Sequence, residues 1–144
     1  MRDYTKIQAW KLADELTVRI YERTRSFPKE ELCGLTSQLR RASYSVAANI
    51  VEGSSRESQR DYLHFLYIAR GSLSEAQYFI HLANRLGYLS ADEAANLHTQ
   101  TKQSFACLHG LIQSVEKQTG KMAKVIASVT SLLALCLPRA FVVL

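Results

Sequence analysis

The segment that decides the fold reads "SYSVAANIVEGSSR" and spans Ser43 to Arg56. Its apolar residues recur at the three- and four-residue spacing of one helical face, and the pattern stops at an acid followed by glycine. Glycine often forms the left-handed cap after a helix, so we expect the helix to end at Glu52 with Gly53 as its cap. A carboxylate in that last turn faces the negative end of the helix dipole, a mismatch worth roughly 0.3 to 1 kcal/mol. Glu52 therefore requires a cation nearby.

Three further helices are predicted around this one. The expected ranges are 5–26, 34–52, 58–87 and 90–118, because Phe27-Pro28 stops the first segment and Gly87 closes the third. Ser58 with Asp61 resembles a capping box, and Ser90 with Glu93 forms one. No segment alternates with a period of two. The sequence thus predicts an all-α protein, an antiparallel up-down-up-down four-helix bundle over residues 1–120, followed by an apolar C-terminal tail over 121–144.

Composition limits the class of protein. A chain of 144 residues with 47% hydrophobic side chains can bury a core as one domain. Its three cysteines show neither a C-x-x-C motif nor metal-ligand spacing, which argues against a disulfide framework or a zinc site. The polar N-terminus "MRDYTKIQAW" lacks the apolar run of a signal peptide. We expect a cytoplasmic protein.

The net charge of +5 comes largely from the C-terminal end. Three of the 18 basic residues lie beyond Gly120, so residues 1–120 carry 15 Lys and Arg against 13 Asp and Glu. A scattered surplus of this size is typical of an ordinary solvated surface. Nucleic-acid binding would require the arginines to gather on one face.

The third helical segment has more apolar surface than one bundle needs. Its hydrophobic side chains cover an arc of roughly 200° on a helical wheel, about twice what the core requires. Contiguous apolar surface on this scale usually marks an interface, so we expect a second copy of the chain to cover it.

Polar residues lie within or beside this arc. Ser72 and Glu75 fall inside it, and the segment before it carries a polar stripe with Arg41, Asn49 and Glu52. A buried carboxylate needs a partner to stay charged. These five residues are therefore predicted to form one buried polar network. The alternative is a solvated row in which Arg56 neutralises Glu52 locally.

The stretches "GLTSQLRRASYSVAANIVEGSSRES", "YLHFLYIARGSLSEA" and "LGYLS", with "IQAWKLADEL" and "SFPKEE" before them, occur in order. Together they closely resemble the four-helix-bundle proteins encoded in intervening sequences of bacterial 23S ribosomal RNA genes, over residues 3 to about 118. The resemblance implies a ring-shaped homo-oligomer, a pentamer. Related accessory variability proteins of diversity-generating retroelements share the bundle and the ring and act with a reverse transcriptase and nucleic acid.

The sequence departs from that family at two places. Ala47 stands where the family usually has proline, so a kink expected in that helix is weaker here. The tail "KMAKVIASVTSLLALCLPRAFVVL" has no counterpart in the family. Its apolar run before Pro138 is shorter than the ~20 residues of a membrane helix, so a membrane anchor is disfavoured. A short packed helix and a disordered extension both remain open.

No enzyme motif is present in the sequence. Di-iron bundles need Glu-x-x-His pairs, and this chain has none. It also lacks a Gly-rich phosphate loop and a G-x-S-x-G elbow. We expect no catalytic residue, no cofactor and no metal. An undetected enzyme would require a concave pocket with perturbed titratable groups.

Two functions remain open. The first is a ring that binds RNA or DNA through Arg40, Arg56 and Arg60, which are expected near the turn between the second and third helices. The second is a scaffold that binds a protein partner and makes no contact with nucleic acid. The distribution of charge over the assembled surface separates the two.

Overall fold

The computed structural model describes the backbone of residues 2–136 and the side chains of residues 2–120. Four α-helices make up most of it: α1 (Gln8–Arg23), α2 (Leu35–Ser55), α3 (Gln59–Arg85) and α4 (Ala91–Cys136). Short 3₁₀ helices, Tyr4–Lys6, Thr24–Ser26 and Lys29–Glu31, precede α1 or join it to α2. Over the described residues the chain is entirely helical, without a strand, which confirms the all-α class.

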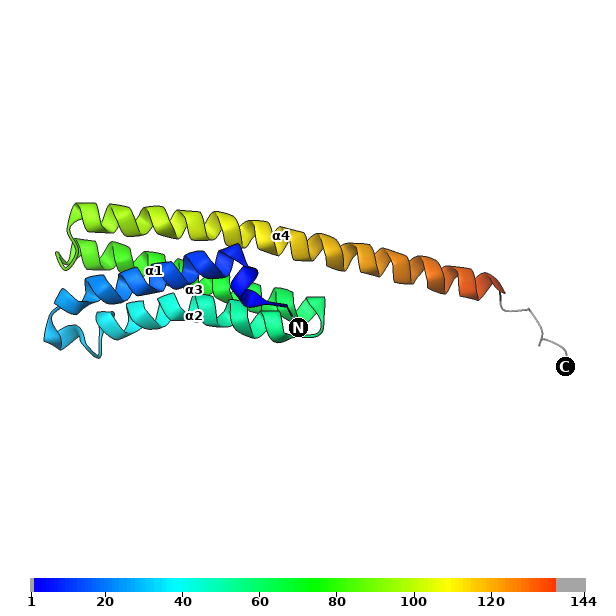
Figure 1. The fold of residues 1–144 in the computed structure, drawn as a ribbon, viewed down its shortest axis with the longest axis horizontal. Coiled ribbons are helices and arrows are strands. Elements are labelled where there is room, and N and C mark those ends of the chain that lie inside the picture. Colours follow the sequence, from blue (N-terminus) through cyan, green and yellow to red (C-terminus); the bar gives the residue numbers. More distant parts are fainter. Residues whose placement is uncertain (1, 137–144) are drawn as a thin grey trace.

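Each helix packs against two others. α1 lies against α2 and α4, and α3 lies against the same two helices, with α2 and α3 sharing the most extensive contact. The α1–α2 connection and the α3–α4 turn lie together at one end of the bundle, and the α2–α3 turn lies at its other end (Figure 1). The end of α4 extends past the other three helices (Figure 1).

One hydrophobic core runs between the four helices. Its side chains come from the apolar stripe of each helix, as the three- and four-residue spacing predicts. The fully buried larger members are Leu16, Ile20, Leu39, Val46, Ile50, Leu66, Leu73, Ile80, Leu108 and Ile112. Buried polar side chains share this interior, and among them Ser43 and Thr101 bond to carbonyl oxygens of their own helices.

The helix starts follow the predicted capping residues. Ser58 accepts a hydrogen bond from the backbone N–H of Asp61 and begins α3. Ser90 and Glu93 exchange the reciprocal bonds of a capping box at the start of α4. Gly87 has φ 76°, a left-handed conformation that favours glycine, and it directly follows the C-cap of α3.

The predicted end of α2 is wrong. The helix continues through Gly53 to Ser55 and ends at Arg56, whose backbone is extended. Gly53 is buried there because α3 passes close by: a Cβ at this position would lie 2.9 Å from the Cβ of Phe65 and 2.9 Å from the ring of Tyr62. The glycine permits a close helix crossing and is not a cap. α2 also runs through Ala47 without interruption.

The predicted end of α4 is also wrong. The helix was expected to stop near Gln118, but it continues to Cys136. A lone glycine such as Gly120 costs only about 1 kcal/mol within a helix and does not stop it. The tail predicted over 121–144 is thus helical in its backbone as far as Cys136, and its remainder lies outside the described residues. Among the described residues, no helix is both long and apolar enough to span a membrane.

Candidate nucleic-acid interface

The three arginines predicted to contact nucleic acid do not lie together. Arg40 is in the second turn of α2, 16 positions before Arg56, which corresponds to about 24 Å along the helix. It turns toward α1, where its Nε donates a hydrogen bond of 2.7 Å to Oγ1 of Thr24. Its guanidinium also lies over the ring of Tyr21, 4.7 Å from the centroid. The prediction that Arg40 lies near the α2–α3 turn is therefore wrong.

Arg56 and Arg60 are at the α2–α3 turn, and the structure adds Arg2 to them. We call these three residues the turn cluster. Nη1 of Arg2 donates to the carbonyl oxygen of Arg56 over 2.9 Å, and its guanidinium lies 4.4 Å from the ring centroid of Tyr62. Sequence reasoning missed Arg2 because 54 positions separate it from Arg56 and no local pattern links the two.

The members of the turn cluster differ in their partners. Arg56 bonds to Glu52 one turn earlier on α2 and lies 4.8 Å from the ring centroid of Phe65. Arg60 is exposed and forms no ion pair or side-chain hydrogen bond within the part of the chain whose side chains are described. Two acids, Glu57 and Asp61, are close in sequence, so the local charge is mixed. Arg60 is the member most available to an external anion.

Glu52 is neutralised within its own helix. Its carboxylate accepts a bond from Arg56, and both side chains are nearly half exposed. Because α2 extends three residues past Glu52, the acid is no longer in the last position of the helix. The local alternative is the one that the structure shows, and Glu52 does not belong to a buried network.

The remaining polar residues form a seam along the α2–α3 contact. The hydroxyls of Ser45 and Ser72 are 3.0 Å apart, and Nδ2 of Asn49 donates to the carbonyl oxygen of Ser45 over 2.7 Å. Nη2 of Arg41 donates to Oε1 of Glu75 over 3.3 Å. We call Arg41, Ser45, Asn49, Ser72 and Glu75 the α2–α3 seam.

Burial within the α2–α3 seam is uneven. Ser72 is buried, but the side chains of Arg41 and Glu75 are 52% and 46% exposed. The prediction of a buried network is therefore wrong for one chain. Glu75 lies opposite Arg41, the expected cation, but both groups are in contact with water. A helical wheel places Glu75 inside the apolar arc, but on a part of the arc that the core of one chain leaves uncovered, so its long side chain stays in contact with water.

Apolar side chains of α3 lie exposed beside this seam. Ile68 is 39% exposed and Leu86 is 48% exposed. Phe79 and Leu82 are only partly buried against the core. On the wheel these four residues share a side of α3 that flanks its buried stripe. We call them the α3 apolar face, and they account for the part of the wide arc that one bundle leaves uncovered.

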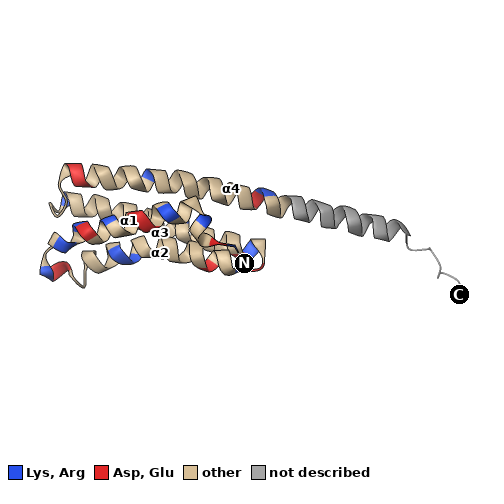
Figure 2. Cartoon of the chain, viewed as in Figure 1, with Lys and Arg blue, Asp and Glu red and all other residues tan. Residues whose placement is uncertain are grey.

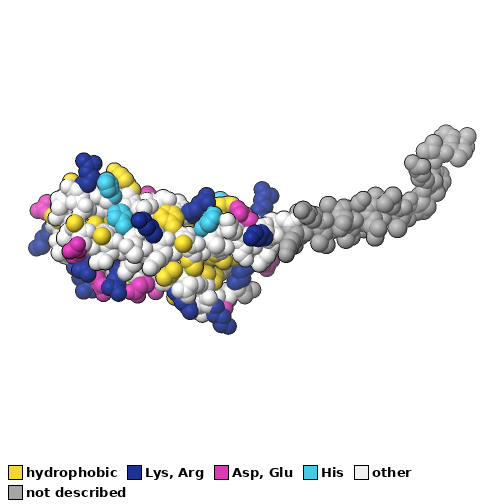
Figure 3. Space-filling model, turned by 90° about the horizontal axis from the view of Figure 1, so that it is seen from above, with side chains coloured by type: hydrophobic (Ala, Val, Ile, Leu, Met, Phe, Trp, Pro, Cys, Tyr) yellow, Lys and Arg dark blue, Asp and Glu magenta, His cyan; other side chains and the backbone are white. Residues whose placement is uncertain are grey.

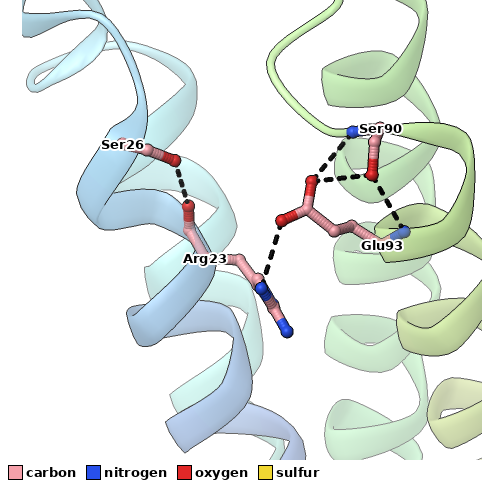
Figure 4. Close-up of polar contacts among 4 residues, drawn as sticks. All are labelled: Arg23, Ser26, Ser90 and Glu93. Carbon is pink, nitrogen blue, oxygen red and sulfur yellow. Dashed lines mark hydrogen bonds and ion pairs between the residues drawn. The ribbon is translucent and has the colours of Figure 1, made fainter.

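A hollow lies between α1 and α4, with a volume of about 420 Å³. Arg23 on α1 donates to Oε1 of Glu93 on α4 over 3.1 Å, while Oε2 of Glu93 accepts from the backbone and hydroxyl of Ser90 (Figure 4). Those bonds from Ser90, helped by Arg23, hold the pKa of Glu93 below its ordinary value. The lowered pKa of Glu93 in this hollow is explained by its capping role.

Charge is mixed over the described surface. Basic and acidic residues are interspersed along the helices (Figure 2), and the face that carries α4 shows scattered Lys and Arg without a continuous basic area (Figure 3). Within the described residues, no group of three or more His, Cys, Asp or Glu side chains is arranged to hold a metal ion. Over its described residues the chain is by fold an all-helical protein with four α-helices, and it leaves the α3 apolar face exposed.

Comparison with known proteins gives the family. Residues 5–110 match the family described as 23S rRNA-intervening sequence protein, and the chain belongs to this family. A crystal structure of a protein of unknown function, from the S23 ribosomal protein family of Bacteroides thetaiotaomicron, has the same fold with a TM-score of 0.65. The two chains are 22% identical, and the match covers 72% of this chain and 97% of the other. No curated protein matches the chain.

Proposed function

We propose that the chain is an up-down-up-down bundle that assembles into a homo-oligomeric ring, a pentamer, and binds the phosphate backbone of RNA or DNA without sequence preference. The turn cluster is the observation that supports the proposed binding of RNA or DNA. Arg60 is exposed with no carboxylate partner among the described side chains, and Arg2 and Arg56 lie at the same end of the bundle. Each exposed guanidinium can donate paired hydrogen bonds to phosphate oxygens.

Assembly is what makes this cluster effective. One chain has a surplus of only two positive charges over residues 1–120, and the acids beside the turn cluster keep its own affinity low. Five copies carry about +10 and present the same arginines repeatedly to one polymer. The exposed α3 apolar face supports assembly, because a second copy would cover it.

Salt dependence tests this function. Labelled single-stranded RNA is titrated with the full chain at about 50 mM and about 200 mM salt. Each neutralised phosphate adds ~0.7 to the slope of the logarithm of the binding constant against the logarithm of the salt concentration. Arg56→Gln with Arg60→Gln should weaken binding and lower the slope, whereas Lys102→Gln on α4 is the matched control outside the turn cluster. Absence of binding at low salt, or a slope unchanged in the double variant, contradicts the proposal.

A scaffold for a protein partner is the second candidate. It is favoured by the mixed charge of the face in Figure 3, which is a poor match for a polyanion. If the oligomer forms but RNA and DNA do not bind at low salt, the α3 apolar face and the mixed surface are left to protein contacts. The sequence predicts a cytoplasmic protein, and either function is compatible with that compartment.

A further inference from the structure

The connection between α1 and α2 encloses a second cationic site, separate from the turn cluster. A hollow of about 280 Å³ lies between the end of α1, the 3₁₀ turn that follows Pro28 and the start of α2. Three cations, Arg25, Lys29 and Arg40, line it. No carboxylate lines it, although Glu22, Glu30 and Glu31 are near in sequence. We call this hollow the connection pocket.

Glu31 is held away from the connection pocket by its own bonds. Its Oε2 accepts from the backbone N–H of Leu35 over 2.8 Å, and its Oε1 accepts from the hydroxyl of Tyr88 over 3.3 Å. The carboxylate therefore serves the start of α2 and the α3–α4 side of the bundle. The three cations are left without an ion-pair partner among the described side chains.

The side chain of Arg40 is held in place but keeps unused hydrogen-bond donors. Its Nε bonds to Thr24, and its guanidinium stacks on Tyr21, so the group has a defined orientation before any ligand arrives. The two terminal nitrogens of the guanidinium make no hydrogen bond to described residues. A guanidinium held by one nitrogen with two more to offer suits an anion with several oxygens.

Thr36 supplies an independent observation. It lines the connection pocket in the first turn of α2, is only 3% exposed, and its Oγ1 has no hydrogen-bond partner within the described residues. A buried hydroxyl left unpaired is costly, and threonine in a helix has two accessible rotamers. The N-terminus of α2, the positive end of that helix, is at the same place.

The remaining walls are apolar. Phe27, Pro28 and Leu32 line the connection pocket beside the cations, and Leu32 is 62% exposed. A bare inorganic ion would leave these side chains without a contact. A phosphate joined to a flat or apolar organic group would use both kinds of wall.

We propose that the connection pocket binds a phosphate monoester, such as a nucleoside 5′-monophosphate or the 5′-phosphate end of an RNA. Arg25, Lys29 and Arg40 hold the phosphoryl oxygens, and Thr36 rotates to donate its hydroxyl. Phe27 and Leu32 contact the organic group. This site recognises the doubly charged terminal phosphate, whereas the turn cluster proposed above contacts internal phosphodiesters.

Calorimetric titration of the full chain with AMP, with inorganic phosphate and with adenosine tests the site. AMP should bind more tightly than either part alone. Arg25→Gln with Lys29→Gln should weaken AMP binding by about tenfold or more, because hydrogen bonds to charged groups are being removed. Lys102→Gln, a cation outside the pocket, should leave it unchanged. Failure of the unmodified chain to bind AMP at millimolar concentration overturns the proposal.

Thr36→Val separates a ligand contact from a structural one. The variant keeps the shape of the side chain and removes a hydroxyl that bonds to nothing in the fold, so its melting temperature should not fall. Its affinity for AMP should fall by several-fold. A lower melting temperature with unchanged AMP affinity would show that the hydroxyl is structural, and the proposal would be wrong.

One pair of probes distinguishes a free nucleotide from an RNA 5′ end as the source of the phosphate monoester. The same pair distinguishes the connection pocket from the turn cluster. The same short RNA is offered with a 5′-phosphate and with a 5′-hydroxyl. Binding through the turn cluster is equal for both, because only the internal phosphates are used. Preference for the phosphorylated end that disappears in Arg25→Gln with Lys29→Gln assigns the RNA terminus to the connection pocket. Equal binding of both RNAs together with tight AMP binding assigns the pocket to a free nucleotide.

Discussion

Arg41 on α2 and Glu75 on α3 form an ion pair with 3.3 Å between Nη2 and Oε1, and about half of each side chain is exposed to water. Exposed pairs contribute about 0 to 1 kcal/mol to stability. Glu75→Ala should therefore change the free energy of unfolding by less than about 1 kcal/mol, as measured by urea denaturation. A loss of roughly 3 kcal/mol or more would mean that assembly buries the pair, since an uncompensated buried charge costs that much.

Gly53 and Gly71 give opposite predictions for the same substitution. A Cβ at Gly53 would lie 2.9 Å from the Cβ of Phe65 and 3.3 Å from the carbonyl oxygen of Tyr62, so α2 and α3 would have to separate. Gly53→Ala should destabilise the fold by roughly 1 to 3 kcal/mol through overpacking. Thermal or urea denaturation measures the loss.

Gly71→Ala is the matched control. Gly71 lies within α3, and a Cβ there meets no atom within 4 Å. Alanine should stabilise the helix by about 0.5 to 1 kcal/mol, because glycine loses more backbone entropy on folding. Equal effects at the two positions would show that the close crossing at Gly53 is not a constraint on the fold.

Gly53 shows what the sequence could and could not predict. The capping serines Ser58 and Ser90 and the left-handed Gly87 were all predictable, because each depends on residues within one turn of the helix end. Gly53 follows an acid and resembles a cap, but its role depends on its packing against α3. That contact forms only when the chain folds back after α2. Tertiary contact decides whether such a glycine ends a helix or lets a neighbour approach.

The candidate site was less predictable than the fold. A helical wheel places the Cβ of each residue, but Arg40 and Glu75 carry long side chains whose charged ends lie several ångströms away. Arg40 turns to Thr24 and Tyr21, and Glu75 reaches solvent. Arg2 depends on a contact with Arg56, 54 positions away, and the connection pocket depends on how the chain turns between Thr24 and Arg40. No local spacing in the sequence reports them.

The carboxylate of Glu93 should make stability depend on pH. Its pKa lies below the ordinary value of 4.5, chiefly because the backbone N–H and hydroxyl of Ser90 donate to it. The charged form thus stabilises the fold above that value, and this contribution is lost as the pH falls through the lowered pKa. Glu93→Gln should be less stable than the unmodified chain at about pH 7 and nearly equal to it at about pH 3.

Ser90→Ala is the control for that experiment. It removes the hydroxyl that accepts from the N–H of Glu93 over 3.2 Å, a cap worth about 0.5 to 2 kcal/mol. The part of the loss that comes from this uncharged acceptor should persist at low pH, unlike that of Glu93→Gln, whereas the part that comes from the bond between the same hydroxyl and the Glu93 carboxylate should disappear. Urea denaturation at both pH values measures the two variants. If Glu93→Gln costs the same at both, the carboxylate's charge does not contribute.

The α3 apolar face should determine the oligomeric state. Ile68 is 39% exposed on this face, whereas Val18 on α1 is 48% exposed and lies outside it, so the two positions are a matched pair. Ile68→Glu places a charge in the proposed contact and should convert the oligomer to monomers, because an unpaired carboxylate is not tolerated in a desolvated interface. Val18→Glu should leave the mass unchanged. Light scattering coupled to size-exclusion chromatography measures both.

Since Ile68 does not contribute to the core of one chain, the melting temperature of the dissociated variant should report a folded bundle. A monomeric mass for the unmodified chain, or an oligomer that survives Ile68→Glu, would show that the α3 apolar face is not the contact between copies.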